Sequence, residues 1–263
     1  MYRLAGFTRG VTATNDAEAI REEFSRIMRL ANYVRPLHPL FARFGVMEED
    51  IIARGQALAD QMLLQEEQSE EDLAELDRLS ASPNTTFLFD EPESFLKSMI
   101  EAHQRKVADD PQTPIFLSVR TDGTYEGEIK RTVYRHGRSF GSLVLQMPMH
   151  DKTDFWYQHW TTMRDIMLAT MDIWEFDWIV AQPTMYIGLQ KNLFPDRRSF
   201  GWMGWTPQDL PRDASSALAR MEPLKGGTFM LLQERMMNMK APDIETCNKA
   251  EAYLLDRGAL AVL

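Results

Sequence analysis

Hydrophobic residues recur every three or four positions through much of this chain, the spacing that gathers side chains on one face of an α-helix. The clearest stripe spans residues 17–31, behind a capping candidate at Asn15 or Asp16. The same spacing, with start and stop signals, predicts further helices over residues 47–63, 73–79, 92–107, 151–174, 214–221 and 243–257. Pro92 suits the first turn of its helix, and Gly258 suits the position after the last one.

Between these helices lie short runs rich in β-branched and aromatic residues, which favour strands. Three consecutive runs, at 115–121, 128–135 and 140–147, are separated by turn signals at Asp122-Gly123 and His136-Gly137, and so predict an antiparallel meander. Further strands are predicted near residues 1–8, 178–181, 200–205 and 228–233. Because helices and hairpins are partly segregated, we predict an α+β fold, a mainly antiparallel sheet with several amphipathic helices packed on it.

A chain of 263 residues can bury a large core without a metal or a disulfide. No Gly/Ser/Pro-rich linker divides it, and no internal repeat is visible. Residues 1–263 are therefore expected to form a single domain.

All six tryptophans lie between residues 156 and 205, so this stretch dominates the hydrophobic pattern. Two interpretations are open. Large rings bury much apolar surface and favour a core role. Alternatively, Trp202 or Trp205, beside Arg197 and Arg198 in a polar loop, anchors a partner protein, because Trp and Arg are enriched at interface hot spots.

A second unusual stretch is acidic, with seven carboxylates in twelve residues and no basic residue among them. They are Glu66, Glu67, Glu70, Glu71, Asp72, Glu75 and Asp77. Leucines at 73, 76 and 79 can hold a short helix against the body and leave the acids in water. The run is then either an ordinary solvated face or a patch that mimics phosphate charge for a basic cleft.

The net charge of −10 and a pI near 5.1 disfavour direct nucleic-acid binding, which needs basic residues to displace counterions. An acidic surface suits a basic protein partner instead. The single cysteine, Cys247, excludes an internal disulfide and is expected to be a buried, inert thiol. No signal-peptide or membrane-spanning pattern is present, so we expect a cytoplasmic protein that does not bind membranes.

Two weak catalytic patterns occur in the meander. Gly137-Arg138-Ser139-Phe140-Gly141 matches GxSxG, but a strand follows Ser139 where a nucleophile elbow needs a helix. Asp122, Glu128 and Lys130 resemble the acid, acid and lysine set of metal-dependent nucleases. Histidines are scattered and phosphate loops are absent, so no cofactor and no metal site is predicted.

Several segments resemble the immunity protein 52 family of bacterial polymorphic toxin systems. They are Pro39-Leu40-Phe41-Ala42-Arg43-Phe44-Gly45, Phe155-Trp156-Tyr157, the strand at Trp178, and Phe194-Pro195-Asp196-Arg197-Arg198 leading to Gly201-Trp202-Met203 and Pro207. The chain also looks like immunity partners of type VI secretion nuclease effectors. The resemblance implies a non-catalytic inhibitor that binds a cognate toxin with a basic, restriction-endonuclease-like nuclease domain.

The expected partner-binding surface is either the acidic run from Glu66 to Asp77 or the loop from Arg197 to Trp205. Two other functions stay open. One is a metal-dependent hydrolase or nuclease using Asp122, Glu128 and Lys130, or a hydrolase using Ser139. The other is a secretion-system adaptor or chaperone. A homo-oligomer is also compatible with the sequence.

Overall fold

The computed structural model describes residues 2–7, 17–37, 39–64, 69–109, 116–121, 133–137, 142–147, 159–211 and 217–263. Its helices are α1 (Ala17–Val34), α2 (Glu49–Leu63), α3 (Glu70–Ser80), α4 (Pro92–Asp109), α6 (Trp160–Met171), α7 (Thr184–Gly188) and α8 (Ala241–Asp256), with 3-10 turns η1 (Arg35–Leu37) and η2 (Pro39–Arg43). Its strands are β1 (Tyr2–Phe7), β2 (Phe44–Val46), β3 (Thr86–Phe87), β4 (Phe116–Thr121), β5 (Val133–Gly137), β6 (Ser142–Met147), β7 (Trp178–Pro183), β8 (Met203–Thr206), β9 (Arg220–Leu224) and β10 (Gly227–Leu231).

The strands form one 10-stranded sheet in the order β3-β2-β4-β5-β6-β1-β7-β8-β10-β9, and every neighbouring pair is antiparallel. Helices pack on it as amphipathic elements, which confirms the predicted α+β class. The antiparallel meander β4-β5-β6 is confirmed, but His136 and Gly137, predicted as a turn, are the last two residues of β5. The first strand of the chain, β1, lies in the middle of the sheet, and its central place was not anticipated.

β1 joins the two halves of the sheet. Each of its residues is paired twice, with β6 on one side and β7 on the other. Leu4, for example, is opposite both Leu145 and Ala181, and Leu4 itself is fully buried. Among the described strands, β1 is the one that is paired with strands of both halves.

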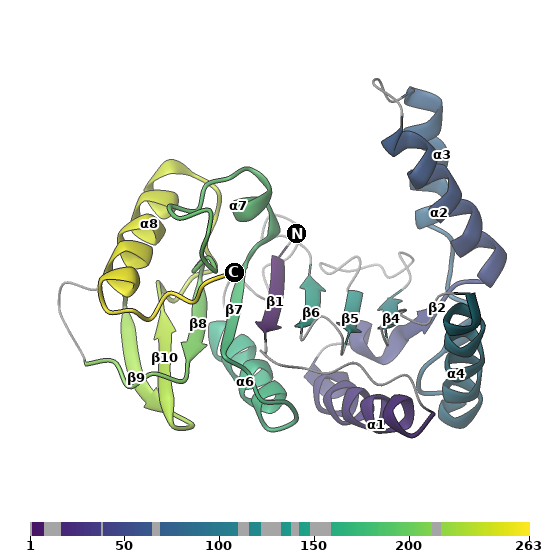
Figure 1. Ribbon diagram of the computed structural model, residues 1–263, viewed down its shortest axis with the longest axis horizontal. Helices are drawn as coiled ribbons and strands as arrows, with labels where there is room; N and C mark the ends of the chain where they lie inside the picture. Colours follow the sequence, from purple (N-terminus) through teal and green to yellow (C-terminus); the bar gives the residue numbers. More distant parts are fainter. Residues whose placement is uncertain are drawn as a thin grey trace.

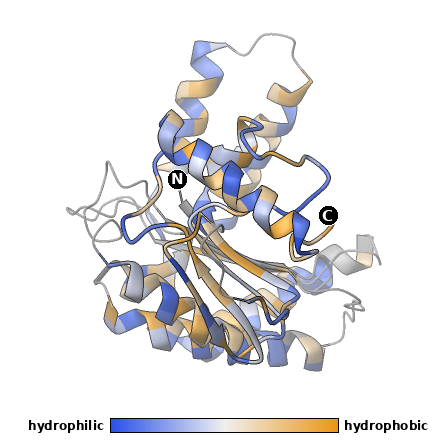
Figure 2. Cartoon of the chain, turned by 90° about the vertical axis from the view of Figure 1, so that its left-hand side faces the viewer, coloured by the Kyte–Doolittle hydropathy of each residue, from blue (hydrophilic) through white to orange (hydrophobic). Residues whose placement is uncertain are grey.

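Helices cover both faces of the sheet, but different parts of it. α1 and α6 lie on the lower face in Figure 1, with α4 beside α1, while α7 and α8 lie on the upper face near β7, β8 and β10. Figure 2 shows the sheet edge-on between these layers. The α1 stripe enters the core as expected, with Phe24, Ile27 and Leu30 all buried.

The predicted helix at 214–221 is wrong at its C-terminal end, because residues 220–224 form β9. β9 and β10 make a hairpin whose loop residues, Lys225 and Gly226, have φ of 46° and 74°. Positive φ at both positions matches the right-handed strand twist, so the turn favours a hairpin over helix continuation. The predicted helix start at 151–158 lies outside the described residues, and α6 is described from Trp160.

In the part of the chain that is described, no helix is both long enough and apolar enough to span a bilayer.

Close backbone approach in the β8-β10 pair gives a stability prediction. A Cβ built on Gly227 would lie 2.1 Å from the Thr206 carbonyl oxygen and 2.8 Å from Pro207 Cα, whereas one on Gly188 would meet nothing within 4 Å. Overpacking against backbone costs about 1–3 kcal/mol. Gly227→Ala should therefore lower the urea midpoint clearly, and Gly188→Ala should leave it nearly unchanged. Equal midpoints for the two variants would contradict this packing.

Candidate functional site

The predicted acidic segment forms a helical hairpin, α2 packed on α3. The Ser69 hydroxyl caps α3 by accepting a hydrogen bond from the Asp72 backbone N–H at 3.0 Å. Glu70, Glu71 and Asp72 occupy its first turn, where negative charge is favoured by the helix dipole. Local helix physics therefore accounts for the position of these acids, and the short helix predicted at 73–79 is confirmed.

This hairpin stands away from the sheet in Figure 1, where α2 and α3 rise beyond the end of β2. Each helix contributes a single buried side chain, Met62 in α2 and Leu79 in α3. At its base, Arg105 of α4 pairs with Glu49 at 3.0 Å. The body thus holds the hairpin at one end and leaves its length in solvent.

The distal part of the hairpin combines exposed acids with exposed leucines. Leu63 and Leu64, at the end of α2, are 80% and 90% exposed. Glu70 and Glu71 are exposed, and no ion pair among the described residues includes either of them. Exposed leucines that adjoin a polar rim are a typical feature of protein interaction sites.

Glu75 differs from the acids before it, because it is compensated locally. Arg78 donates to it at 2.6 Å and Arg54 of α2 at 3.2 Å. The Arg78 hydrogen bond lowers the pKa of Glu75. Glu66 and Glu67 lie outside the described residues. Of the predicted acidic patch, Glu70, Glu71 and Asp77 are therefore the described members that are exposed and belong to no ion pair among the described residues.

The second predicted surface, the aromatic loop, needs correction. Trp202 is 0% exposed and Trp205 is 6% exposed. Their indole N–H groups donate to the carbonyl oxygens of Gln233 at 2.9 Å and Leu224 at 2.8 Å. Both rings therefore belong to the core, the first of the two interpretations, and neither can anchor a partner in this fold.

The two arginines of that loop are half-buried and contact their own chain. Arg197 pairs with Asp196 at 3.3 Å, and its backbone makes a bridge with Val262. The Arg198 guanidinium lies over the Phe7 ring, 3.8 Å from its centroid. These contacts fix the loop against β1 and the C-terminal segment.

Beneath the loop lies a buried carboxylate that the sequence analysis did not single out. Glu251 of α8 is 1% exposed and accepts backbone N–H groups from Leu193 at 2.7 Å and Phe200 at 2.9 Å. Burial raises the pKa of Glu251 to about 7, although both N–H groups favour the charged form. In the sequence, Glu251 falls within the apolar stripe of α8 that includes Cys247 and Leu254. That position is the feature from which its burial could have been predicted.

The expectation for Cys247 is confirmed, because its thiol is fully buried. It donates to the carbonyl oxygen of Phe200 and lies 3.4 Å from that of Gly201. Burial raises the pKa of Cys247 well above its usual value, so the thiol stays protonated at neutral pH. Tyr186 lies nearby and donates to the Asn248 side chain at 2.7 Å.

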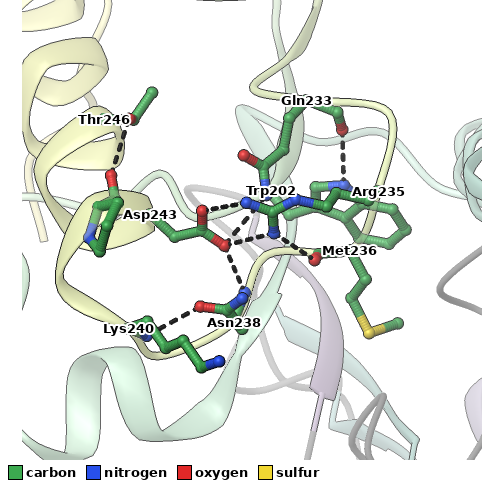
Figure 3. Close-up of polar contacts among 9 residues, drawn as sticks. Trp202, Gln233, Arg235, Met236, Asn238, Lys240, Asp243 and Thr246 are labelled. Carbon is green, nitrogen blue, oxygen red and sulfur yellow. Dashed lines mark hydrogen bonds and ion pairs between the residues drawn. The ribbon is translucent and has the colours of Figure 1, made fainter.

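A second buried acid organises the start of α8, as Figure 3 shows. Asp243 forms a two-point ion pair with Arg235 and accepts from the Asn238 backbone N–H at 2.8 Å and from Gln233 at 3.2 Å. Burial alone would raise the pKa of Asp243, but Arg235 and the other donors outweigh it and hold the pKa below its ordinary value. The Gln233 backbone carbonyl oxygen also accepts the hydrogen bond of the Trp202 indole N–H. The network therefore connects α8 to the aromatic core.

A surface cavity of about 300 Å³ lies between α1 and α6. It is lined by Arg29, Tyr33, Asp165, Leu168, Ala169, Asp172 and Ile173. Burial and the charges of Asp165 and Asp172 raise the pKa of Tyr33. However, Arg164 pairs with Asp165 and Lys225 pairs with Asp172, so the two carboxylates already have cationic partners.

The candidate catalytic residues Asp122, Glu128, Lys130 and Ser139 lie outside the described residues. Within the described ranges, no three His, Cys, Asp or Glu side chains gather closely enough to hold a metal ion. Comparison of the sequence with protein-family models and with curated proteins finds no match.

The Glu251 centre predicts an unusual pH dependence. Its folded pKa of about 7 lies above the ordinary 4.5, so folding favours the protonated acid. The contribution of Glu251 to the free energy of unfolding is fully present at low pH. It decreases by about 3 kcal/mol as the pH rises from about 4.5 to about 7. The free energy of unfolding of wild type, relative to Glu251→Gln, should fall by that order between these pH values.

Urea unfolding at several pH values measures this difference. The comparison with Glu251→Gln removes contributions from other groups, including Asp243, whose lowered pKa acts in the opposite direction. A difference that is constant with pH would contradict the account of Glu251.

Proposed function

We propose that this protein is an immunity protein, which binds a cognate nuclease-type toxin in the cytoplasm and neutralises it without catalysis. The observation that carries the proposal is the projecting α2–α3 hairpin with its exposed acids and leucines. The resemblance of the chain to the immunity protein 52 family supports the same function.

Charge supports a nuclease as the partner. Enzymes that act on nucleic acid present basic surfaces to the phosphate backbone. The described residues of α3 include five acids, Glu70, Glu71, Asp72, Glu75 and Asp77, and one basic residue, Arg78. An acidic helix is attracted to such a basic cleft. The net charge of −10 also disfavours binding of this chain itself to DNA or RNA.

Apolar contact is also required, because electrostatic attraction raises the association rate more than the affinity. Leu63 and Leu64 supply apolar surface next to the acids. The hairpin can enter the active-site cleft or bind beside it and distort the enzyme, and both modes bury the same surface. In either mode the hairpin supplies the contact surface.

Co-expression with the nuclease-type toxin encoded beside this gene tests the function. We expect this chain to restore growth and to co-purify with the toxin. A Leu63→Ser/Leu64→Ser variant should fold normally, because both leucines are exposed, yet lose most of the rescue. Leu193→Ser, at an exposed position far from the hairpin in the sequence, is the matched control. Undiminished killing in the presence of the folded wild-type chain would refute the proposal.

Charge reversal tests the acidic face separately. Glu70→Lys/Glu71→Lys should slow association with the toxin by about tenfold at low salt and reduce the dependence of the rate on salt. Glu245→Lys, on the exposed side of α8, provides the control. Stopped-flow or surface-binding kinetics at several salt concentrations measure both quantities. An unchanged rate and salt dependence in the double variant would exclude the acidic face from the interface.

A further inference from the structure

The surface cavity between α1 and α6 brings together side chains from two distant parts of the chain. Its volume of about 300 Å³ is that of a small-molecule site, and polar as well as apolar atoms face it. The lining residues, spaced three or four apart, form one stripe on each side. They are Arg29 and Tyr33 of α1, and Asp165, Leu168, Ala169, Asp172 and Ile173 of α6 and the residues after it.

Both carboxylates in the cavity wall keep an oxygen without a partner. Arg164 donates to Asp165 through Oδ1 alone, at 3.1 and 3.3 Å, and Lys225 also contacts Asp172 through Oδ1. Among the described residues, no hydrogen bond or ion pair uses Oδ2 of either aspartate. The side chains of Asp165 and Asp172 are 45% and 65% exposed, so their present ion pairs are weak surface pairs. Each carboxylate can therefore accept from a further cation.

The α1 side of the cavity supplies a positive charge. Arg29 is exposed, and its guanidinium group makes no ion pair or hydrogen bond with any described residue. A guanidinium group binds a carboxylate through two parallel hydrogen bonds. Tyr33 is 42% exposed, and its ring can pack on an alkyl chain or a cation. A ligand in the cavity thus meets one positive donor group and two negative acceptor groups.

The two aspartates lie at opposite ends of an apolar strip. Asp165 and Asp172 are two helical turns apart, about 10 Å along the axis, and Leu168 and Ala169 lie between them on the same stripe. An alkyl chain with an ammonium group at each end matches this order of acid, apolar surface and acid. A purely apolar ligand would leave both carboxylates and Arg29 unused.

We propose that this cavity binds a free basic amino acid, with L-lysine as its simplest example. The ligand carboxylate pairs with Arg29. The two ammonium groups bind the Oδ2 atoms of Asp165 and Asp172, and the alkyl chain packs on Leu168 and Ala169. The site lies with α1 and α6 on the lower face of the sheet in Figure 1, away from the hairpin, and it does not depend on the proposed inhibitor function.

Isothermal titration calorimetry of the full chain with three probes tests the site. L-lysine carries every charged group, cadaverine lacks the carboxylate, and L-norleucine lacks the side-chain ammonium. We expect lysine to bind, and each analogue to bind at least about tenfold more weakly, because one charge-assisted contact is lost. An analogue that binds as tightly as lysine overturns the proposal. So does the absence of lysine binding up to about 10 mM, where even a Kd of about 1 mM gives near-complete occupancy.

Arg29→Met and Arg21→Met are matched variants. Each removes an exposed arginine of α1 that has no ion pair among the described residues, but Arg21 does not line the cavity. Arg29→Met should weaken lysine binding by at least about tenfold and leave cadaverine binding unchanged or stronger. Arg21→Met should keep the wild-type affinity for both probes. Wild-type lysine affinity in Arg29→Met would place binding elsewhere and overturn the site.

The double variant Asp165→Asn/Asp172→Asn tests the two acceptors. Its lysine affinity should fall by about a hundredfold, since both charged contacts are lost. Glu175→Gln/Asp177→Asn, which removes two exposed acids from the loop after α6, should keep the wild-type affinity. Retained affinity in the first double variant overturns the proposal. Should that variant fail to fold, the same comparison in Asp172→Asn alone decides, with loss in favour and retention against.

Discussion

The pairing of β1 with both β6 and β7 holds the two halves of this protein together. On one side of β1 the sheet continues to β3, and on the other to β9. Among the described strands, only β1 is paired with strands of both halves. Packing of α1 against α6, where the Trp174 indole N–H donates to Glu23 at 3.2 Å, adds a second connection between the halves. The partners of β1 are more than 130 residues away along the chain, so the central pairing requires long-range closure during folding.

Around this strand, two buried acids fix the irregular segments that carry the aromatic core. Glu251 holds the backbone at Leu193 and Phe200, and Asp243 holds the segment from Gln233 to Asn238. The two acids differ in the groups that stabilise their buried negative charge. Asp243 has a guanidinium partner and stays ionised, whereas Glu251 is stabilised by backbone N–H groups and the Tyr186 hydroxyl and is close to its midpoint at neutral pH. The described part of the aromatic stretch is therefore a scaffold, because Trp174, Trp178, Trp202 and Trp205 are all buried in the core.

Local patterns in the sequence predicted elements that local physics determines. The α1 stripe, the Pro92 start of α4 and the left-handed Gly258 after α8 each follow from a few neighbouring residues. The hairpin turn at Lys225 and Gly226 was missed because the apolar spacing before it also fits a helix. The central place of β1 was not predictable, because six weakly alternating residues carry no information about distant partners.

The candidate site was predictable only in part, for a physical reason. A run of acids must be exposed, so its place on the surface follows from sequence, but a solvated face and a binding face have the same composition. Tryptophans at 202 and 205 suit a core, and less commonly an interface, and their burial decides for the core.

Hydrogen–deuterium exchange of the purified protein, alone and mixed with its cognate nuclease toxin, tests the central claim most directly. If the hairpin is the inhibitory surface, amide protection on complex formation will concentrate in residues 49–80, with little change in α8. Protection confined to other elements, or none at toxin concentrations that saturate inhibition, would contradict the account.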